Sequence, residues 1–406
     1  MTQQTGERPA TASSYAIRSS FAVRSAAFSA AIFFAVGIYL PFFPVWMAGK
    51  GLSEPQIASV IAAPLFIRAV LGPLLAAFAD RVGTLGRAAV VYAAVTAAVF
   101  APMAALPVYA VILVLSTAAM IFWTALIPLG DAIIVAGVRR HGLDYARVRL
   151  WGSVAFIAGN FAAAEAIGRV GGEGVFALQV AAFFAGSVAA LFLPLVRDVR
   201  EARGTAGFKR AFGDPVLRRA ILAGGVIMAT HGAYYAFGTL HWRALGFGDR
   251  TIAGLWAFSV LIEVALFWFA RRLTGWGARR FLLAGGAAAV VRWALFPLLT
   301  APVAVYVLQM LHALTFAATH LGVMMAIGAV ATPGHTARLQ ASHQMIAGLL
   351  LASATVAAGP LYRSAPHLAF WAMAGLGVLG VVVAFGLKRG LQPHSEAGGG
   401  STSPPV

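Results

Sequence analysis

Long apolar stretches alternate with short polar connections along most of the chain. A helix of about 20 apolar residues is long enough to cross the hydrocarbon core of a bilayer. The pattern therefore predicts an all-α membrane protein with twelve transmembrane helices. The predicted helices cover residues 25–48, 55–79, 88–106, 109–137, 150–169, 175–196, 220–242, 251–270, 281–299, 303–330, 340–362 and 367–387.

The longest polar connection, residues 197–219, divides the predicted helices six and six and carries seven basic residues. We expect it to be a linker between two halves. The last residues of the chain are rich in Gly, Ser and Pro and have little to bury, which predicts a disordered tail. The predicted organisation is a cytoplasmic N-terminal segment (1–24), a six-helix half (25–196), a cytoplasmic linker (197–219), a second six-helix half (220–387) and a cytoplasmic tail (388–406).

The two halves resemble each other at three places. FADRVGTLGR (78–87) matches FARRLTGWGARR (269–280), and RLWGSVAFIAG (149–159) matches RLQASHQMIAG (338–348). The third pair of similar segments is GKGLSEPQIA and RALGFGDRTIA. All offsets lie between about 189 and 196 residues, so one duplication explains them, as in transporters built from repeated units around a central site.

The composition suits a bilayer better than water. Hydrophobic residues make up 60% of the chain and charged residues 11%, with a mean hydropathy of +0.84. The absence of cysteine excludes disulfides and thiolate metal sites. The net charge of +17 is spread in short clusters between apolar stretches, so we expect no nucleic-acid partner, and no metal or cofactor.

The basic residues predict the orientation of the chain. Two lie within predicted helices, and most of the 30 Lys and Arg residues fall on the side of the membrane that holds both termini. Because cytoplasmic loops are enriched in Lys and Arg, we expect both termini in the cytoplasm. The five on the opposite side are Lys50, Arg169, Arg243, Arg250 and Arg363.

The loop after the second predicted helix contains Asp80-Arg81-x-Gly83 followed by Arg87. It resembles the loop motif of the major facilitator superfamily, although Ala76 stands where the leading glycine is usual. The resemblance implies that Asp80 and Arg81 form a cytoplasmic gate that latches the two halves. An ordinary positive-inside loop is the alternative.

A closer resemblance covers nearly the whole chain. It rests on GIYLPFFPVW (37–46), PLGDA (128–132), DYARVRLWGSVAF (144–156), HGAYYAF (231–237), VVRW (290–293) and LHALTF (311–316). These segments are similar to the phenylpropionate permease family, relatives of the galactoside/proton symporters. The resemblance implies a bacterial inner-membrane symporter that imports an aromatic carboxylate such as 3-phenylpropionate with protons by alternating access. We expect it to act as a monomer.

Ionisable residues inside the predicted helices are the main functional candidates, because a charge at mid-bilayer costs roughly 2.5–3.5 kcal/mol. Arg68 is the candidate anchor for a substrate carboxylate, since its guanidinium offers a two-pronged donor for a planar anion. Arg292 is the rival anchor, and an ion pair between helices is the alternative for Arg68. Glu165 is expected to pair with Arg169 outside the site.

The resemblance supplies further substrate-binding candidates. Galactoside symporters place an acid and an arginine where this chain has Asp131 and Arg149, so these two are expected to bind the substrate. Trp151 is a candidate stacking face, and Tyr234 and Tyr235 are candidate walls of an apolar pocket. A structural ion pair and simple packing are the respective alternatives.

Glu263, Arg292 and His312 match positions of the proton-coupling network in the galactoside symporters. One turn beyond His312 those symporters carry an essential glutamate, whereas this chain has Thr315. The proton is therefore expected on Glu263, His312, His320 or Asp131. The predicted proton-coupling residues are Glu263, Arg292, His312 and His320.

Other classes of protein fit less well. The chain has no HExxH, no GxSxG and no clustered metal ligands, so we expect no enzyme activity. A channel would need no coupling network. Within transporters, a proton-coupled sugar or nucleoside symporter and a proton/drug antiporter stay open. The fifth predicted helix has Gly152 and Gly159 but no proline, unlike the antiporter signature, which favours uptake.

Overall fold

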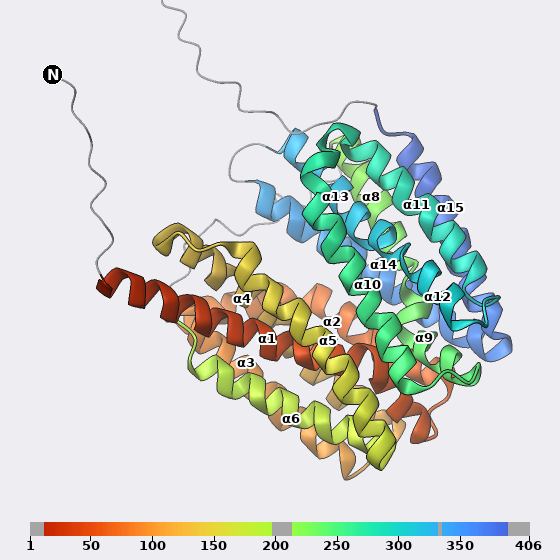
Figure 1. Cartoon of the computed structure of the whole chain (residues 1–406), viewed down its shortest axis with the longest axis horizontal. Coiled ribbons are helices and arrows are strands. Elements are labelled where there is room, and N and C mark those ends of the chain that lie inside the picture. The colour runs from red at the N-terminus through yellow and green to blue at the C-terminus, as the bar shows by residue number, and fades with distance from the viewer. Residues whose placement is uncertain (1–11, 197–212, 332–334, 389–406) are drawn as a thin grey trace, which may run out of the picture. The chain divides into compact units, whose positions relative to one another are not determined.

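The computed structural model describes residues 12–196, 213–331 and 335–388, and every regular element in these ranges is a helix (Figure 1). The predicted all-α architecture is therefore confirmed. The α-helices are α1 (Ala12–Gly49), α2 (Glu54–Arg81), α3 (Leu85–Phe100), α4 (Tyr109–His141), α5 (Tyr145–Val170), α6 (Gly172–Leu191), α8 (Pro215–Ala229), α9 (Gly232–Ala244), α10 (Asp249–Phe269), α11 (Gly277–Leu295), α12 (Pro302–Gln309), α13 (Thr319–Val330), α14 (Thr336–Ser364) and α15 (Pro366–Phe385).

Shorter helical segments join or interrupt these helices. Two are 3-10 segments, η1 (Ala101–Ala104) and η2 (Ala270–Trp276), and one is a π-helical segment, η3 (Ala313–Ala318). Most of the predicted linker and tail, together with the start of the N-terminal segment, lies outside the described residues. The described end of the linker already belongs to α8, which begins at Pro215 with Asp214 as its cap.

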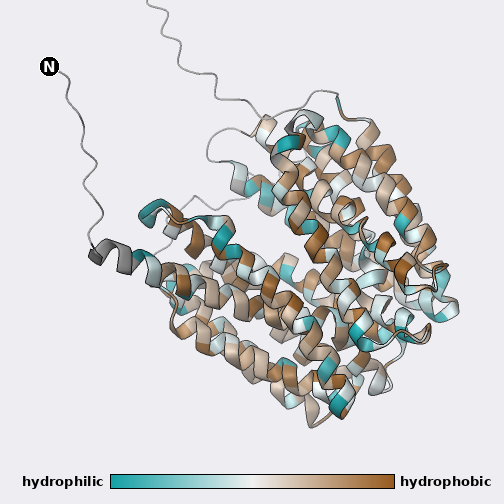
Figure 2. Ribbon diagram, in the orientation of Figure 1, coloured by the Kyte–Doolittle hydropathy of each residue, from teal (hydrophilic) through white to brown (hydrophobic). Residues whose placement is uncertain are grey.

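Eleven helices among the described residues are long and apolar enough to cross a membrane. α11, the ninth predicted crossing, is not among them. It is 19 residues long and packs beside α13 and α15, but it carries Arg279, Arg280 and Arg292. Its charge, and not its length, separates it from the other crossings. In Figure 2 hydrophilic residues gather mainly at helix ends, while the middle stretches are largely hydrophobic.

The chain forms two compact units. Unit 1 contains Met1–Val199 and Gly238–Ala257, and unit 2 contains Arg200–Phe237 and Phe258–Val406. The segment Gly238–Ala257, which includes the end of α9 and the start of α10, belongs to unit 1. In unit 1 an ion pair between Arg250 and Glu165 (2.8 Å) joins this segment to α5.

In unit 1, α1 and α5 pack together more extensively than any other pair of helices. Two glycines permit the contact. A Cβ atom on Gly37 would collide with the backbone oxygen of Phe156, and one on Gly159 would collide with the backbone oxygen of Phe34. Small residues that let backbones approach closely are a common means of helix association in membranes.

In unit 2, α8 packs against α14 and α15, and α11 packs against α13 and α15. Two of the predicted crossings are not regular α-helices. Residues Thr230 and His231 interrupt the crossing formed by α8 and α9, and the π-helical segment η3 lies between α12 and α13. Interrupted helices and π-helical turns in membrane proteins often accompany functional sites.

The packing of α1 against α5 makes a testable prediction. Replacing Gly159 by Ala should lower the free energy of unfolding by about 1–3 kcal/mol, because the added methyl group has no space. Gly168 lies on the same helix, and no atom lies within 4 Å of the position that its Cβ atom would take. Gly168→Ala is therefore the matched control and should be neutral. Thermal unfolding in detergent measures both, and equal melting temperatures for the two variants would contradict the packing argument.

Candidate functional site

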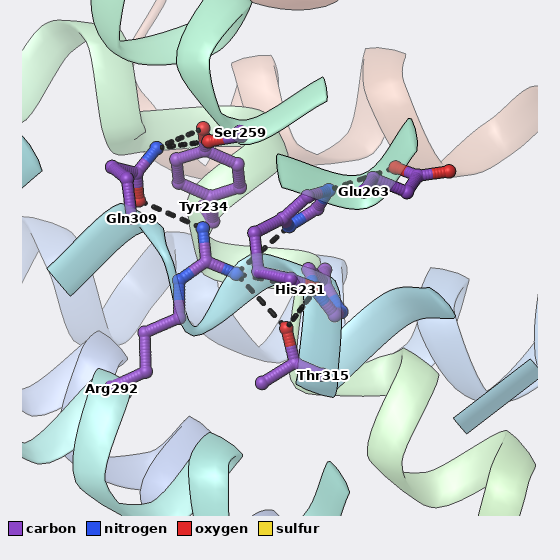
Figure 3. Close-up of polar contacts among 8 residues, drawn as sticks. His231, Tyr234, Ser259, Glu263, Arg292, Gln309 and Thr315 are labelled. Atoms are coloured by element: carbon purple, nitrogen blue, oxygen red, sulfur yellow. Dashed lines mark hydrogen bonds and ion pairs between the residues drawn. The ribbon is translucent and has the colours of Figure 1, made fainter. Parts of the chain in front are cut away.

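The centre of the candidate site in unit 2 is Arg292, on α11, whose side chain is 0% exposed. Its Nη2 donates to Oε1 of Gln309 at 2.9 Å, and its Nη1 donates to Oγ1 of Thr315 at 3.1 Å (Figure 3). The guanidinium also lies over the rings of Tyr234 and Trp293, at 4.9 and 4.4 Å from the centroids. A buried cation is thus surrounded by neutral groups.

His312 joins this cation to a carboxylate. Nη1 of Arg292 lies 3.0 Å from Nδ1 of His312. Arginine has no acceptor atom, so Nδ1 must accept and the proton of a neutral His312 must sit on Nε2. Nε2 lies 3.6 Å from Oε2 of Glu263, which comes from α10. The order of groups is therefore Arg292, His312 and Glu263.

His231 completes the same cluster from the break between α8 and α9. Its Nδ1 lies 3.0 Å from the backbone oxygen of Met228, which can only accept, so Nδ1 carries the proton. Its Nε2 then accepts, and it lies 3.1 Å from Oγ1 of Thr315 and 3.4 Å from Nη1 of Arg292. Thr315 therefore stands between the arginine and a histidine.

Tyr234 and Gln309 hold the other side of the guanidinium. Nε2 of Gln309 donates to the hydroxyl of Tyr234 at 2.9 Å and to Oγ of Ser259 at 2.8 Å. All three side chains are buried. Tyr235, the second predicted pocket residue, instead stacks on His231 with ring centroids 5.5 Å apart.

The arrangement links the charge of His312 to the position of Arg292. A proton added at Nδ1 of His312 would remove the acceptor of the Arg292 bond and place two cations 3.0 Å apart. The same proton would strengthen the attraction between His312 and Glu263. Protonation in this cluster therefore requires the side chains to rearrange, which is a means of coupling a proton to a change in conformation.

His320, the fourth predicted proton-coupling residue, lies on α13 beyond the π-helical segment. It interacts electrostatically with Glu263. Direct contacts thus join Glu263, Arg292 and His312, whereas His320 lies about two helical turns farther along the same crossing.

In unit 1, Asp131 and Arg149 form an ion pair between α4 and α5, with 3.4 Å between Oδ1 and Nε. Tyr145 donates to the same carboxylate oxygen at 3.1 Å, and the guanidinium lies 3.9 Å from the ring centroid of Phe33. A Cβ atom on Gly152 would lie 2.6 Å from Nη1 of Arg149. Gly152 therefore leaves the space in which Arg149 lies.

Arg68 differs from the other predicted residues. It lies on α2, is half-buried, and forms no hydrogen bond or ion pair with the described residues.

The remaining predicted residues lie nearer the surface of their helices. Trp151, on α5, is 58% exposed and so presents an open ring face. Asp80 and Arg81 are exposed in the last turn of α2. Glu165 pairs with Arg169 at 3.0 Å, as the sequence predicted, and also with Arg250.

Sequence reasoning gave no role to His231, Ser259 or His343. A histidine inside an apolar stretch was the available signal for His231 and His343, but burial and partners depend on tertiary packing. Within residues 12–196, 213–331 and 335–388, no group of three or more His, Cys, Asp or Glu side chains is placed to hold a metal ion.

The polar shell around Arg292 makes a second prediction. Gln309→Leu should lower the free energy of unfolding by at least about 2 kcal/mol, because it leaves a buried charged donor without its acceptor. Gln179 is a matched control, since it is also 0% exposed but neither of its amide atoms has a partner among the described residues. Gln179→Leu should be neutral or stabilising. The melting temperatures of the two variants in detergent test this, and an unchanged Gln309→Leu protein would argue against the shell.

Comparison with known proteins places these features in a family. A family model described as "MFS_1 like family" matches residues 27–372. A protein of Escherichia coli (strain K12), named "Probable 3-phenylpropionic acid transporter", is 32% identical over 355 residues, which cover 84% of this chain and 91% of that protein. A "Maltose permease" of Geobacillus stearothermophilus is 32% identical over 130 residues, 31% of this chain and 32% of that protein.

Solved structures share the fold. A mutant of the nucleoside transporter NupG superposes with a TM-score of 0.78 at 14% identity, covering 90% of this chain and 99% of that one. A bacterial homologue of the human lysosomal transporter Spinster gives a TM-score of 0.68 at 13% identity, covering 94% and 97%. Together with the family match, these likenesses confirm the predicted resemblance: the chain belongs to the MFS_1 like family and is a multi-pass membrane transporter with the major facilitator fold.

Proposed function

We propose that this transporter imports a small aromatic carboxylate, with 3-phenylpropionate as the first candidate, together with a proton. The protein works by alternating access in the bacterial inner membrane, with both termini and the Asp80–Arg81 gate on the cytoplasmic side. The name of the Escherichia coli relative supports the choice of substrate. The excess of basic residues on the side of the termini supports the orientation.

The observation that carries the proposal is the guanidinium of Arg68. It lies half-buried within a membrane span and has no hydrogen bond or ion pair with the described residues. An arginine in a membrane protein is costly unless a counter-charge or water meets it. A carboxylate substrate supplies that counter-charge and matches the planar, two-pronged geometry of the donor.

Arg292, the rival anchor, fits this role less well. Both of its terminal nitrogens are already occupied by Gln309, Thr315 and His312, and the side chain is fully buried. A substrate would have to displace these partners. We therefore assign Arg292 to proton coupling and Arg68 to the substrate.

Proton coupling is supported by the order of Arg292, His312 and Glu263. Histidine is the side chain whose charge most readily changes near neutral pH, and here it lies between a cation and a carboxylate. Thr315 stands where related symporters carry an acid, and it accepts from Arg292 instead. Glu263 is then the carboxylate that takes the proton.

The first test is uptake of labelled 3-phenylpropionate into proteoliposomes that contain the purified protein, with and without an inward proton gradient. The wild-type protein should accumulate the substrate only with the gradient. Arg68→Ala should reduce accumulation by at least about tenfold, because a buried anion loses its partner. Arg68→Lys should retain part of the activity, since it keeps the charge and loses the fork.

Arg140 is the control for this series, because it is exposed at the end of α4. Arg140→Ala should transport like the wild-type protein. No uptake by the wild-type protein would remove 3-phenylpropionate as the substrate and reopen sugars, nucleosides and drugs. Full uptake by Arg68→Ala would remove Arg68 as the anchor.

A second test separates a carboxylate from a neutral solute electrically. One monoanionic carboxylate that enters with one proton moves no net charge, so a membrane potential should leave its accumulation unchanged. A neutral sugar or nucleoside that enters with one proton would instead respond by roughly 2.3 kcal/mol per 100 mV. Potassium diffusion potentials across the proteoliposome membrane measure this difference, and a potential-driven accumulation would favour the sugar or nucleoside alternative.

A further inference from the structure

His343, on α14, is a buried histidine with no role in the site described above. Its side chain is 1% exposed, and its Nδ1 has no hydrogen-bond partner among the described residues. An unsatisfied polar atom in a membrane-spanning core carries a cost of about 1–3 kcal/mol. A function that uses the free nitrogen would account for that cost.

The neighbours of His343 lead back to the site. His343 interacts electrostatically with His320, and His320 interacts electrostatically with Glu263. The packing agrees with this order. A Cβ atom on Gly224 of α8 would collide with Val323 of α13 and would lie 3.4 Å from Cε1 of His343. Val323 is three residues after His320 and so lies on the same side of α13.

The π-helical segment η3 places His312 and His320 on the same side of their crossing. Eight residues separate the two histidines, and in a regular α-helix eight residues turn about 80° beyond two full turns. A π-helical turn takes up one extra residue, which sets the phase back by roughly 100°. The two histidines therefore lie within about 20° of the same side of the crossing.

The lining of η3 favours this distortion. Oγ1 of Thr319 donates to the backbone oxygen of Leu314 at 3.3 Å, five residues earlier. On the facing helix α11, a Cβ atom on Gly285 would lie 3.0 Å from the same oxygen. A glycine at this position thus leaves room for the wider turn.

The three histidines stand at successive depths in unit 2. His312 lies roughly 27 Å along the helix from the end of α13, and His320 lies about 15 Å from it. His343 lies about 10 Å from the start of α14. Only residues 331–335 join the end of α13 to the start of α14, so these two helix ends lie at the same end of unit 2. The histidines therefore form a series that leads from the Arg292 cluster toward that end.

We propose that Glu263 gives up the transported proton to His320 and His343, which form its exit route toward the end of unit 2 where α13 ends and α14 begins. The proton leaves the Glu263 carboxyl for a ring nitrogen of His320. The proton on the other ring nitrogen of His320 then moves to His343. His343 in turn releases a proton to water. Each ring returns to its neutral form, and Glu263 is left as the carboxylate.

This inference rests on the proposed proton coupling and names a route for it. The proton would enter the series from the Glu263 end, where Arg292 and His312 oppose a further positive charge. Other charged or titratable groups occur at the ends of the helices that pack around His343. They are Arg218 and Arg219 on α8, and His335 and Arg338 at the start of α14.

The test compares His320→Asn and His343→Asn with the wild-type protein in proteoliposomes, by two assays. Gradient-driven accumulation of 3-phenylpropionate requires the proton to leave the protein, whereas exchange of external for internal substrate does not. We expect each variant to lose accumulation by at least about tenfold and to keep exchange within about twofold. His367→Asn is the control and should keep both accumulation and exchange. His367 lies at the start of α15, where its ring lies against Trp371, away from the proposed exit.

The outcomes separate this inference from the function on which it rests. If the wild-type protein itself shows no gradient-driven accumulation, the proposed coupling fails and the route fails with it. If the wild-type protein accumulates substrate and His343→Asn does so equally well, only the route is overturned. Equal loss of accumulation and exchange would also overturn it, since that result indicates a structural role for the histidine.

Discussion

The burial of one guanidinium organises unit 2. Arg292 cannot lose its charge, so the low-dielectric interior must supply acceptors for it. They come from a helix break that presents His231 and from a crossing whose α-helical path is interrupted next to His312 and Thr315. These two irregular segments of unit 2 therefore occur where a charge has to be satisfied.

Unit 1 meets its charges differently. Arg149 is paired directly with Asp131, and the glycine next in the motif leaves the room in which it lies. Close glycine contacts between α1 and α5 make this unit a tightly packed body on the sides of these helices. Arg68 is the exception, because this half-buried guanidinium has no hydrogen bond or ion pair with the described residues.

Most of the fold could be predicted from the sequence, because apolar stretches of bilayer length have few alternatives to a membrane-spanning helix. The meeting of Glu263, Arg292 and His312 was also predicted, through the resemblance. Hydropathy could not reveal the break at His231 or the π-helical turn, since both depend on which neighbouring groups satisfy the backbone. Hydropathy could not reveal the surroundings of Ser259 and His343 either, because a polar residue in an apolar stretch looks the same whether it faces a partner or packs alone.

The π-helical turn also restricts how this crossing can evolve. A π-helical turn is in effect an α-helix with one inserted residue, so a single deletion between residues 313 and 318 would restore a regular helix. The deletion would bring His320 to seven residues after His312, and seven residues of a regular α-helix turn about 20° short of two full turns, so the two histidines would still lie on the same side. Conversion of the π-helical turn to a regular α-helix with all eight residues kept would instead rotate His320 by about 100° away from His312. The number of residues between the histidines and the type of helix that joins them must therefore change together. Relatives that keep both histidines should have either this spacing with a π-helical turn or a spacing one residue shorter with a regular α-helix.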